Sequence, residues 1–507
     1  MGTASPLPMF LRLWLSGSLP IAPVMHDILI IGGGINGTAI ARDAAMNGLS
    51  VLLVEKDDLA SHTSSASTKL IHGGLRYLEY YEFKLVREAL MERERLLRTA
   101  PHLIYPMLFV LPHQNAVRPW WLVRLGLWLY DTIGGRISLP RSRGLRRGDD
   151  LFRAPLKEAS KGFVYSDAWV DDARLVVLNA VDAAKHGAQV RTRTGLVSAR
   201  RVKGHWEAEL TDGSTVEARA IVNAAGPWVA ELLAKAGINA ASKVRLIKGS
   251  HIVVDQLFAG SHAYMLQQPD KRVVFAIAYE EGLTLIGTTD EQVERPEDAV
   301  ISTAEIDYLC AAANLYFKRQ IGPADVRATY SGVRPLYDDG ASEAKAVTRD
   351  YVLELDANGP PLLSVFGGKI TTSRHLAEEA IKKLAPALGR NVAPVTGSAP
   401  LPGGNLPCAF PEFLNRVRAT YPFLGEERSE RMARAYGTLL ALMLEGVTSE
   451  AAMGKAFGGG LTKVELDWLV RNEWATTAED VLMRRTKIGL AVGPEVAKAV
   501  ADYLKRR

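Results

Sequence analysis

The sequence predicts an α/β protein with a parallel sheet, a second and mostly antiparallel sheet, and a helical C-terminal domain. Residues 26–55 read as a buried apolar strand, a glycine-rich turn, a helix and a second apolar strand. Residues 243–290 contain apolar runs that suit strands of an antiparallel sheet. After the Pro- and Gly-rich linker 400–407 the composition becomes helical, which indicates a separate helical domain over 408–507.

The first unit contains the glycine pattern of dinucleotide-binding domains. Gly32-x-Gly34-x-x-Gly37 follows the apolar run 28–31. One glycine permits a tight turn, one lets the backbone approach a pyrophosphate, and one allows the helix to pack closely on the strand. The phosphates are expected at the helix N-terminus, where unpaired N–H groups and the helix dipole attract anions. The next strand ends in Glu55, placed to accept hydrogen bonds from ribose hydroxyls, and an acid there disfavours NADP.

Further stretches complete the predicted organisation. Residues 61–81 are too polar and too often broken by glycine for an ordinary helix or strand, whereas 83–99 has the apolar spacing of an amphipathic helix. Residues 221–228 read as a short buried strand ending in a Gly-Pro turn, where the domain would close over the nucleotide a second time. Thr476-x-x-Glu479 predicts a capping box, and the C-terminal domain carries no catalytic signature.

Length and composition restrict the class of protein. A chain of 507 residues predicts two or three domains. The formal net charge of +5 suits an anionic substrate or an anionic membrane surface. Nucleic acid is not expected, because no basic run resembles a nucleic-acid-binding module. Cys310 and Cys408 are too few for a disulfide framework or a metal site, so no metal is expected and a reducing cytoplasm fits. No apolar run reaches the roughly 18 residues that would predict a transmembrane helix.

Two segments need separate interpretation. Residues 101–147 combine Trp120, Trp121 and Trp128 with leucine, valine and several arginines. This composition suits the boundary between water and lipid headgroups, and the alternative is a core helix with the arginines on its solvent side. Residues 1–24 lack the charge pattern of a signal peptide, and we expect them to be a disordered N-terminal extension.

Nine motifs follow one another between residues 25 and 507: DILIIGGGINGTAIARDAA, TSSASTKLIHGGLRYLE, FVYSDAWVDDARLV, RLIKGSHIVV, LIGTTD, YSGVRPL, TRDY, SVFGGKITT and RRTK. Together they resemble the FAD-dependent glycerol-3-phosphate dehydrogenases, the quinone-linked and membrane-associated kind. The resemblance implies a glutathione-reductase-like, Rossmann-type FAD-binding domain interleaved with an α+β substrate-binding cap, followed by an all-α domain. The implied FAD-binding segments are about 25–80, 160–235 and 330–399, and the implied cap segments are about 81–159 and 236–329.

The resemblance also implies a reaction and a location. The reaction is oxidation of sn-glycerol 3-phosphate to dihydroxyacetone phosphate by hydride transfer to FAD, with electrons passed to ubiquinone of the respiratory chain in glycerol catabolism. The location is the cytoplasm, peripherally on the inner face of the cytoplasmic membrane and in contact with anionic lipid. The sequence leaves the oligomeric state open, and a homodimer is one alternative.

Two alternative functions stay open at this point. One is another FAD-dependent oxidoreductase of the same fold that acts on an amino acid or a 2-hydroxy acid. The other is a flavin-bearing binding protein without turnover. The cations of the motifs favour a phosphorylated substrate over the first alternative, because a carboxylate would need one arginine rather than a cluster.

The resemblance assigns the substrate contacts and the catalytic groups. Arg76, Arg334, Arg349 and Lys369 are the expected substrate clamps, with Tyr77 hydrogen-bonding beside Arg76. A general base with a pKa near the working pH is preferred for removal of the hydroxyl proton. His251 is the first choice and His72 the alternative, because histidine titrates in that range. Arg334 would otherwise stabilise the alkoxide without taking the proton, and Lys369 would help hold negative charge on the reduced flavin.

The FAD contacts carried over from the family motifs combine the glycines, the acid after the second strand and the serine-rich loop. The serines would supply neutral hydroxyl and backbone donors to phosphate and flavin, and the alternative is a flexible loop. The expected FAD contacts are Gly32, Gly34, Asn36, Gly37, Glu55, Ser64, Ser65, Ser67, Lys69, Gly226, Trp228, Gly368, Lys369 and Thr371.

Overall fold

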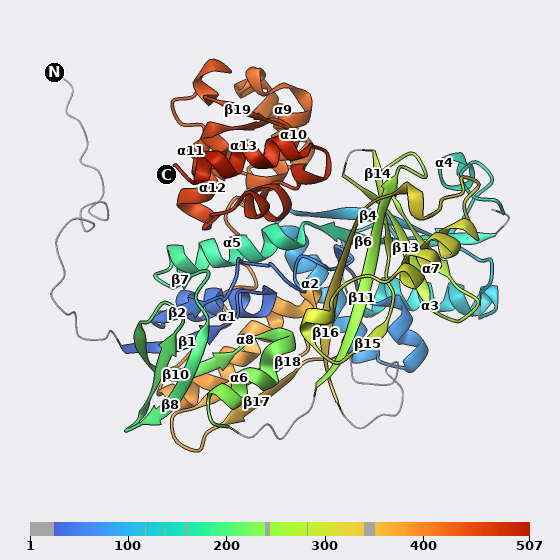
Figure 1. Cartoon of the computed structure of the whole chain (residues 1–507). Helices are drawn as coiled ribbons and strands as arrows, with labels where there is room; N and C mark the ends of the chain where they lie inside the picture. The colour runs from blue at the N-terminus through green and yellow to red at the C-terminus, as the bar shows by residue number, and fades with distance from the viewer. Residues whose placement is uncertain are drawn as a thin grey trace.

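The structure is a computed structural model that describes residues 25–116, 118–135, 137–158, 161–238, 244–280, 282–338 and 350–506. The expected extension 1–24 and the expected substrate clamp Arg349 lie outside the described residues. Within these ranges the chain forms two large sheets that lie side by side and a C-terminal helical domain, coloured orange to red in Figure 1.

The first sheet is mostly parallel and carries the predicted strand–helix–strand unit. Its strands run in the order β17 (Val352–Asp356), β18 (Leu362–Phe366), β10 (Thr215–Asn223), β1 (Met25–Ile31), β2 (Val51–Val54) and β7 (Gln189–Arg191). The pairs from β18 to β7 are parallel, and β17 is antiparallel to β18. β8 (Leu196–Val202) and β9 (His205–Leu210) extend β10 as an antiparallel meander. The predicted strand 28–31 is confirmed at the centre of this sheet.

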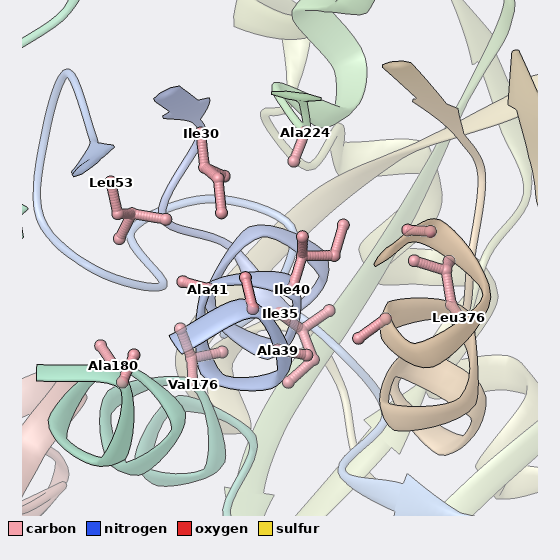
Figure 2. Close-up of a cluster of buried hydrophobic side chains, with 14 of the residues drawn as sticks. Ile30, Ile35, Ala39, Ile40, Ala41, Leu53, Val176, Ala180, Ala224 and Leu376 are labelled. Carbon is pink, nitrogen blue, oxygen red and sulfur yellow. The ribbon is translucent and has the colours of Figure 1, made fainter. Parts of the chain in front are cut away.

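Helices cover one face of the first sheet, as Figure 2 shows. They are α1 (Ile35–Met46), α5 (Asp172–Lys185) and α8 (Ser373–Leu384). Ile30 and Leu53 from the strands share one buried cluster with Ala41 of α1, Val176 of α5 and Leu376 of α8. The opposite face packs on the meander and on α6 (Val229–Lys235). Because both faces are buried, β1 and β2 are continuous apolar runs rather than alternating ones.

The second sheet is mostly antiparallel, as predicted. Its strands run in the order β15 (Glu291–Val293), β11 (Val244–Asp255), β14 (Leu283–Gly287), β13 (Val273–Tyr279), β12 (Ala263–Gln267), β4 (Ile104–Pro112), β6 (Gly162–Val170) and β3 (Leu70–Ile71). β16 (Val326–Tyr337) pairs with β11, and β5 (Arg143–Gly144) pairs with β6. The pair β12–β4 is parallel. β11, β14 and β16 bring the KGSH, LIGTTD and YSGVRPL motifs together on adjacent strands.

Short helices connect the two sheets and surround the second. The predicted amphipathic helix is confirmed as α2 (Phe83–Thr99), which follows the 3₁₀ helix η2 (Leu75–Tyr80). The remaining elements before the linker are α3 (Trp120–Ile133), α4 (Asp150–Arg153), η3 (Gly226–Trp228), η4 (Pro296–Asp298), α7 (Thr303–Asn314), η5 (Pro323–Asp325), η6 (Ile370–Thr372) and η7 (Ala385–Leu388).

The C-terminal domain has a core of its own, which includes Met432, Tyr436, Leu466 and Val481. A short hairpin, β19 (Ala456–Gly458) with β20 (Leu461–Thr462), joins its helices. The helices are α9 (Phe410–Thr420), η8 (Pro422–Leu424), α10 (Gly425–Tyr436), α11 (Leu439–Met443), η9 (Ala451–Met453), α12 (Lys463–Glu473), the π-helix η10 (Asp480–Arg485), η11 (Ile488–Leu490) and α13 (Pro494–Leu504). α12 and η10 contact α5 of the first domain.

The predicted capping box of this domain is wrong by one residue. Thr477 N donates to Asp480 Oδ2 at 2.9 Å, and Asp480 N donates to Thr477 Oγ1 at 3.2 Å. Of the two neighbouring acids, Asp480 is buried and also accepts hydrogen bonds from Arg193 and Arg484. Glu479 is largely exposed. The contact of Asp480 with Arg193, which lies 287 residues away in the chain, favours this register and leaves no signal in the local pattern.

Candidate active site

The turn before α1 and the end of β10 approach so closely that neither Gly32 nor Gly37 has room for a side chain. The turn formed by residues 32–37 is named here the glycine cradle. Gly32 has φ +116°, and a Cβ there would lie 2.4 Å from the carbonyl oxygen of Ala224. A Cβ on Gly37 would lie 1.9 Å from the oxygen of Gly32. Both distances are far below van der Waals contact, so this turn can close only with glycine. The start of α1 lies on the wall of a cavity of about 320 Å³, where helix N–H groups favour an anion.

The cavity separates the expected FAD contacts into two groups. Gly32, Gly34, Asn36, Glu55, Ser64, Gly226, Trp228 and Gly368 line it. Gly37 supports the cradle from behind, and the remaining expected contacts do not line the cavity: Ser65, Ser67, Lys69, Lys369 and Thr371. The residues of the first group therefore share one cavity, whereas those of the second group lie outside its lining, with Thr371 Oγ1 accepting from His72 N at 3.4 Å.

Glu55 stands at the end of β2, as its sequence position predicts. Its Oε2 accepts from Gly33 N at 2.6 Å, and its Oε1 accepts from Asp57 N at 2.9 Å. Burial raises the pKa of the Glu55 carboxyl. Glu55, Asp57 and His62 bring potential metal-ligand atoms within 4.8 Å of one another, but both Glu55 oxygens already hold the turn. The remaining lone pairs of these oxygens suit a ribose hydroxyl.

Residues 58–69 form a loop over the cradle, named here the serine loop. Ser64 Oγ accepts from Ile35 N at 2.9 Å and so touches the first turn of α1. Ser67 Oγ donates to Asp172 Oδ2 at 2.8 Å, and Lys69 Nζ donates to both oxygens of Asp172 and to Ser65 O. The polar groups of Ser67 and Lys69 are therefore engaged in a buried network beneath the loop.

Two further lining side chains are the indole of Trp228 and the amide of Asn36. Trp228 Nε1 donates to Glu297 Oε1 at 2.7 Å, while the Lys56 ammonium lies 3.5 Å from the Trp228 ring centroid. Asn36 Nδ2 donates to Gly367 O at 3.0 Å and ties α1 to the end of β18. Asn36 Oδ1 is buried and has no hydrogen-bond donor among the described residues.

The expected substrate cations lie on three different segments, and none of the three lines the cavity. Lys369 Nζ is buried, has no hydrogen-bond acceptor among the described residues, and lies 4.2 Å from the Tyr77 ring centroid. Arg334 on β16 contacts Asp290 Oδ1 at 2.8 Å and donates to Thr289 O at 3.1 Å. Arg76 donates to Lys271 O at 2.8 Å from the exposed side of η2. The structure thus joins Lys369 to Tyr77 directly.

Two histidines lie in the region expected to hold the base. His251 Nε2 lies 3.1 Å from Thr68 Oγ1, and its ring stacks on Tyr330 with centroids 4.7 Å apart. Burial, with the nearby charges of Lys69 and Arg334, lowers the pKa of His251 to about 3. Burial also lowers the pKa of His72. His251 is consequently neutral at pH 7, able to accept a proton but only as a weak base in this arrangement.

Several residues at the site were not predicted from the sequence. Asp172 anchors Ser67 and Lys69, and Asp58 at the start of the serine loop accepts hydrogen bonds from Arg484 and Arg485 of the C-terminal domain. The adjacent pair of aspartates at 171–172 and the RRTK motif were the available signals. Neither signal indicates a partner, because the paired residues lie far apart in the chain.

The geometry of the site fits FAD. Gly32 and Gly37 let the first turn of α1 pack closely against the backbone after β1 and β10, and the acid after β2 lines the same cavity. Asn36 Oδ1 and Lys369 Nζ are buried polar atoms that have no protein partner among the described residues. Such atoms normally find a partner in a native protein, and a bound cofactor or substrate would supply it.

Comparisons with known proteins identify the family. The model of the FAD dependent oxidoreductases matches residues 27–374, and that of the C-terminal domain of alpha-glycerophosphate oxidase matches residues 394–507. The glycerol-3-phosphate dehydrogenase of Pseudomonas aeruginosa is 52% identical over 96% of each chain. The aerobic glycerol-3-phosphate dehydrogenase of Escherichia coli is 48% identical over 94% of this chain and 97% of its own. The D-erythritol 1-phosphate dehydrogenase of Brucella abortus is 52% identical over 92% of this chain and 95% of its own.

Solved structures agree with the sequence relatives. The glycerol-3-phosphate dehydrogenase from Bacillus halodurans complexed with FAD has a TM-score of 0.74 and 28% identity, over 95% of this chain and 91% of that one. A glycine oxidase from Bacillus cereus, with a TM-score of 0.56 and 20% identity over 72% of this chain and 98% of that one, shares the fold alone. The chain therefore belongs to the FAD-dependent glycerol-3-phosphate dehydrogenase family.

Proposed function

We propose that this protein oxidises sn-glycerol 3-phosphate to dihydroxyacetone phosphate, with FAD as hydride acceptor and ubiquinone as the final acceptor. The observation that carries the proposal is Lys369. Its ammonium is buried beside the Tyr77 ring without a hydrogen-bond acceptor among the described residues, and the residue directly follows Gly368, which lines the cavity. A buried cation needs an anionic partner, and a phosphate ester supplies one.

Substrate binding follows from the chemistry of the surrounding side chains. Arg334 uses part of its guanidinium for Asp290 and Thr289, and its side chain remains 36% exposed, so further donors can reach a phosphate or a hydroxyl. Arg76 lies on the same 3₁₀ helix as Tyr77, where it donates to Lys271 O, and we expect it to reach the substrate from the solvent side. These groups orient a phosphorylated polyol while the Tyr77 ring excludes water from Lys369.

Two groups of the site can assist the loss of the substrate hydroxyl proton. His251 is neutral at pH 7 and can accept it through Nε2, which faces Thr68. Arg334, close enough to His251 to lower its pKa, can instead stabilise an alkoxide without taking the proton. FAD, when bound, supplies the acceptor for the hydride from the carbinol carbon.

We further propose peripheral contact with an anionic membrane through α3. Trp121, Leu125 and Trp128 are 65%, 51% and 54% exposed and recur on one face of the helix. Arg118 is exposed at the start of the helix. The outward face of α3 is therefore apolar with a basic end, which suits the lipid boundary. None of the helices in the described ranges is long and apolar enough to cross a bilayer.

Electron delivery to ubiquinone fits the same surface. α3 contacts η2, the element that carries Arg76 and Tyr77. A membrane-bound quinone reached through this face would lie near the substrate pocket rather than on the far side of the molecule. This neighbourhood is the support for a respiratory acceptor.

A substrate panel tests the function. Purified holoenzyme is assayed with an artificial electron acceptor and glycerol 3-phosphate, D-erythritol 1-phosphate, glycine or 2-hydroxyglutarate. The expected result is turnover with glycerol 3-phosphate and background rates with the two carboxylates. Preferred turnover of D-erythritol 1-phosphate would reassign the substrate within the phosphorylated polyols, and turnover of either carboxylate alone would overturn the proposal.

A further inference from the structure

The serine loop is tied at its first residue to the C-terminal domain. Arg484 Nε donates to Asp58 Oδ2 at 2.7 Å, and Arg485 donates to both oxygens of Asp58 at 2.8 and 2.9 Å. All three side chains are buried. Asp58 lies three residues after Glu55, the acid expected to bind the ribose. These arginines therefore also fix the segment that follows Glu55.

The other end of the loop is tied to the same domain. Lys487 forms an ion pair with Asp171, and its Nζ lies 3.8 Å from Asp172 Oδ1. Asp172 in turn accepts from Ser67 and Lys69. The two aspartates thus lie between the ammonium groups of Lys487 and Lys69. Each of these four side chains is largely or fully buried.

The residues between these anchors face the site. Ser64 Oγ accepts from the first turn of α1, and Thr63 Oγ1 donates to Val333 O at 2.7 Å beside Arg334. Thr68 Oγ1 contacts His251 Nε2 at 3.1 Å. A shift of either anchor would move the cofactor cradle, the strand that carries Arg334 and the candidate base together.

The segment that supplies the anchors is itself unusual. Arg484 and Arg485 end the π-helix η10, and Lys487 has a left-handed backbone with φ +57°. π-Helical turns occur most often at functional sites, and a non-glycine residue with positive φ needs support from its surroundings. Here the support is the set of contacts that the three cations make with the first domain.

We propose that the C-terminal domain is a positioning element of the flavin site. Arg484 and Arg485 at one end, and Lys487 at the other, hold the serine loop in the conformation that binds FAD and orients His251. This inference rests on the FAD site described above, and it assigns to the RRTK motif a role that does not involve contact with cofactor or substrate.

The experiment compares the full-length wild-type protein with Lys487→Met and with Lys487→Arg. Hydrogen exchange of amides in residues 61–69 is measured in the apoprotein, and the dissociation constant of FAD is measured by titration. The expected result for Lys487→Met is faster exchange in the loop and FAD binding weakened about tenfold, with protection in α10 and α12 retained. Lys487→Arg keeps the charge and is expected to restore most of both readouts.

Arg431→Met is the matched control. Arg431 forms a partly buried pair with Glu465 inside the C-terminal domain, at 2.6 and 2.7 Å, and does not contact the serine loop. This variant is expected to lower the melting temperature while loop exchange and FAD affinity stay at wild-type values. Equal loosening of the loop in Arg431→Met would show a general effect of domain stability and would overturn the proposal.

Asp171→Asn guards against misfolding of the first variant. Asn retains the helix cap that Asp171 forms with Arg174 N, and it removes the charge that faces Lys487. Loop exchange is expected to rise in this variant too. Wild-type loop exchange and wild-type FAD affinity in both Lys487→Met and Asp171→Asn would contradict the proposal, and none of these readouts depends on which substrate is turned over.

Discussion

Lys369 shows how one side chain can indicate a ligand. Its ammonium nitrogen is buried against the Tyr77 ring, and the described residues offer it no hydrogen-bond acceptor. The aromatic ring stabilises a cation in this position by about 0.5–2 kcal/mol but accepts no ordinary hydrogen bond from it. A bound anion would supply the hydrogen-bond acceptors that Nζ lacks.

Replacement of Lys369 by methionine is expected to impair catalysis without loss of stability. A charge-assisted hydrogen bond contributes about 1.5–3 kcal/mol, so kcat/KM for glycerol 3-phosphate should fall by about 10- to 150-fold. The melting temperature should stay the same or rise, because a buried charge is removed. Lys382→Met, at an exposed position of α8, is the control and should keep wild-type kinetics. Wild-type kcat/KM in Lys369→Met would exclude this ammonium from substrate binding.

Asp43 gives the fold a pH dependence with a definite sign. Burial in α1, and then the nearby charge of Glu378, raises the pKa of Asp43 to about 6. The folded state therefore holds this proton more tightly than the unfolded chain. The resulting stability is fully present below about pH 4 and is lost as the pH rises through about 6.

Asp43→Asn is expected to remove this dependence. At pH 7.5 the variant should be more stable than wild type by roughly 1–3 kcal/mol, and the difference should shrink as the pH falls to 5. Melting temperatures of the two proteins between pH 5 and 8 check this, with the exposed Asp502→Asn as control. A constant difference across that range would show that Asp43 does not titrate there.

At the scale of elements, the sequence predicted what depends on local periodicity. The strand–glycine–helix–strand unit, the amphipathic helix α2 and the antiparallel second sheet are confirmed because burial patterns determine them. The π-helix η10 and the one-residue shift of its capping box were missed because Asp480 is buried in a contact with Arg193, 287 residues away in the chain. The ties of Lys69 and Ser67 to Asp172 span more than 100 residues and leave no trace in spacing.

α3 is the element whose prediction the structure sharpens. The sequence grouped Trp120, Trp121 and Trp128 together, but Trp120 stacks on Phe163 with centroids 5.1 Å apart. Trp121 and Trp128 are more than half exposed. The two outward tryptophans can therefore be removed with little effect on the packing of the fold.

The double variant Trp121→Ala with Trp128→Ala is expected to lose affinity for vesicles of anionic lipid. Each buried indole contributes about 1.5–3 kcal/mol, so the partition coefficient should fall by at least about tenfold. Sedimentation with vesicles measures this, and Leu442→Ala, at an exposed apolar position of the C-terminal domain, is the control. Equal vesicle binding by the double variant and wild type would remove α3 from the contact surface.

At the scale of the whole molecule, the serine loop connects three parts of the chain. It contacts the start of α1 through Ser64, the strands that carry Arg334 and His251 through Thr63 and Thr68, and the C-terminal domain through Asp58. A buried ion pair between Arg174 of α5 and Glu473 of α12 adds a further tie across the last interface. This arrangement explains why motifs spread along the entire chain can serve a single reaction.

The central claim is that the flavin shares its pocket with a cluster of cations that binds the substrate phosphate. The most direct test is stopped-flow reduction of the bound flavin under anaerobic conditions, with glycerol 3-phosphate compared with glycerol. Loss of the oxidised-flavin absorbance is expected with glycerol 3-phosphate, at a second-order rate at least about 10²-fold above that with glycerol, since two or more charge-assisted hydrogen bonds are lost without the phosphate. A flavin that stays oxidised with glycerol 3-phosphate, or that glycerol reduces equally fast, would contradict this assignment.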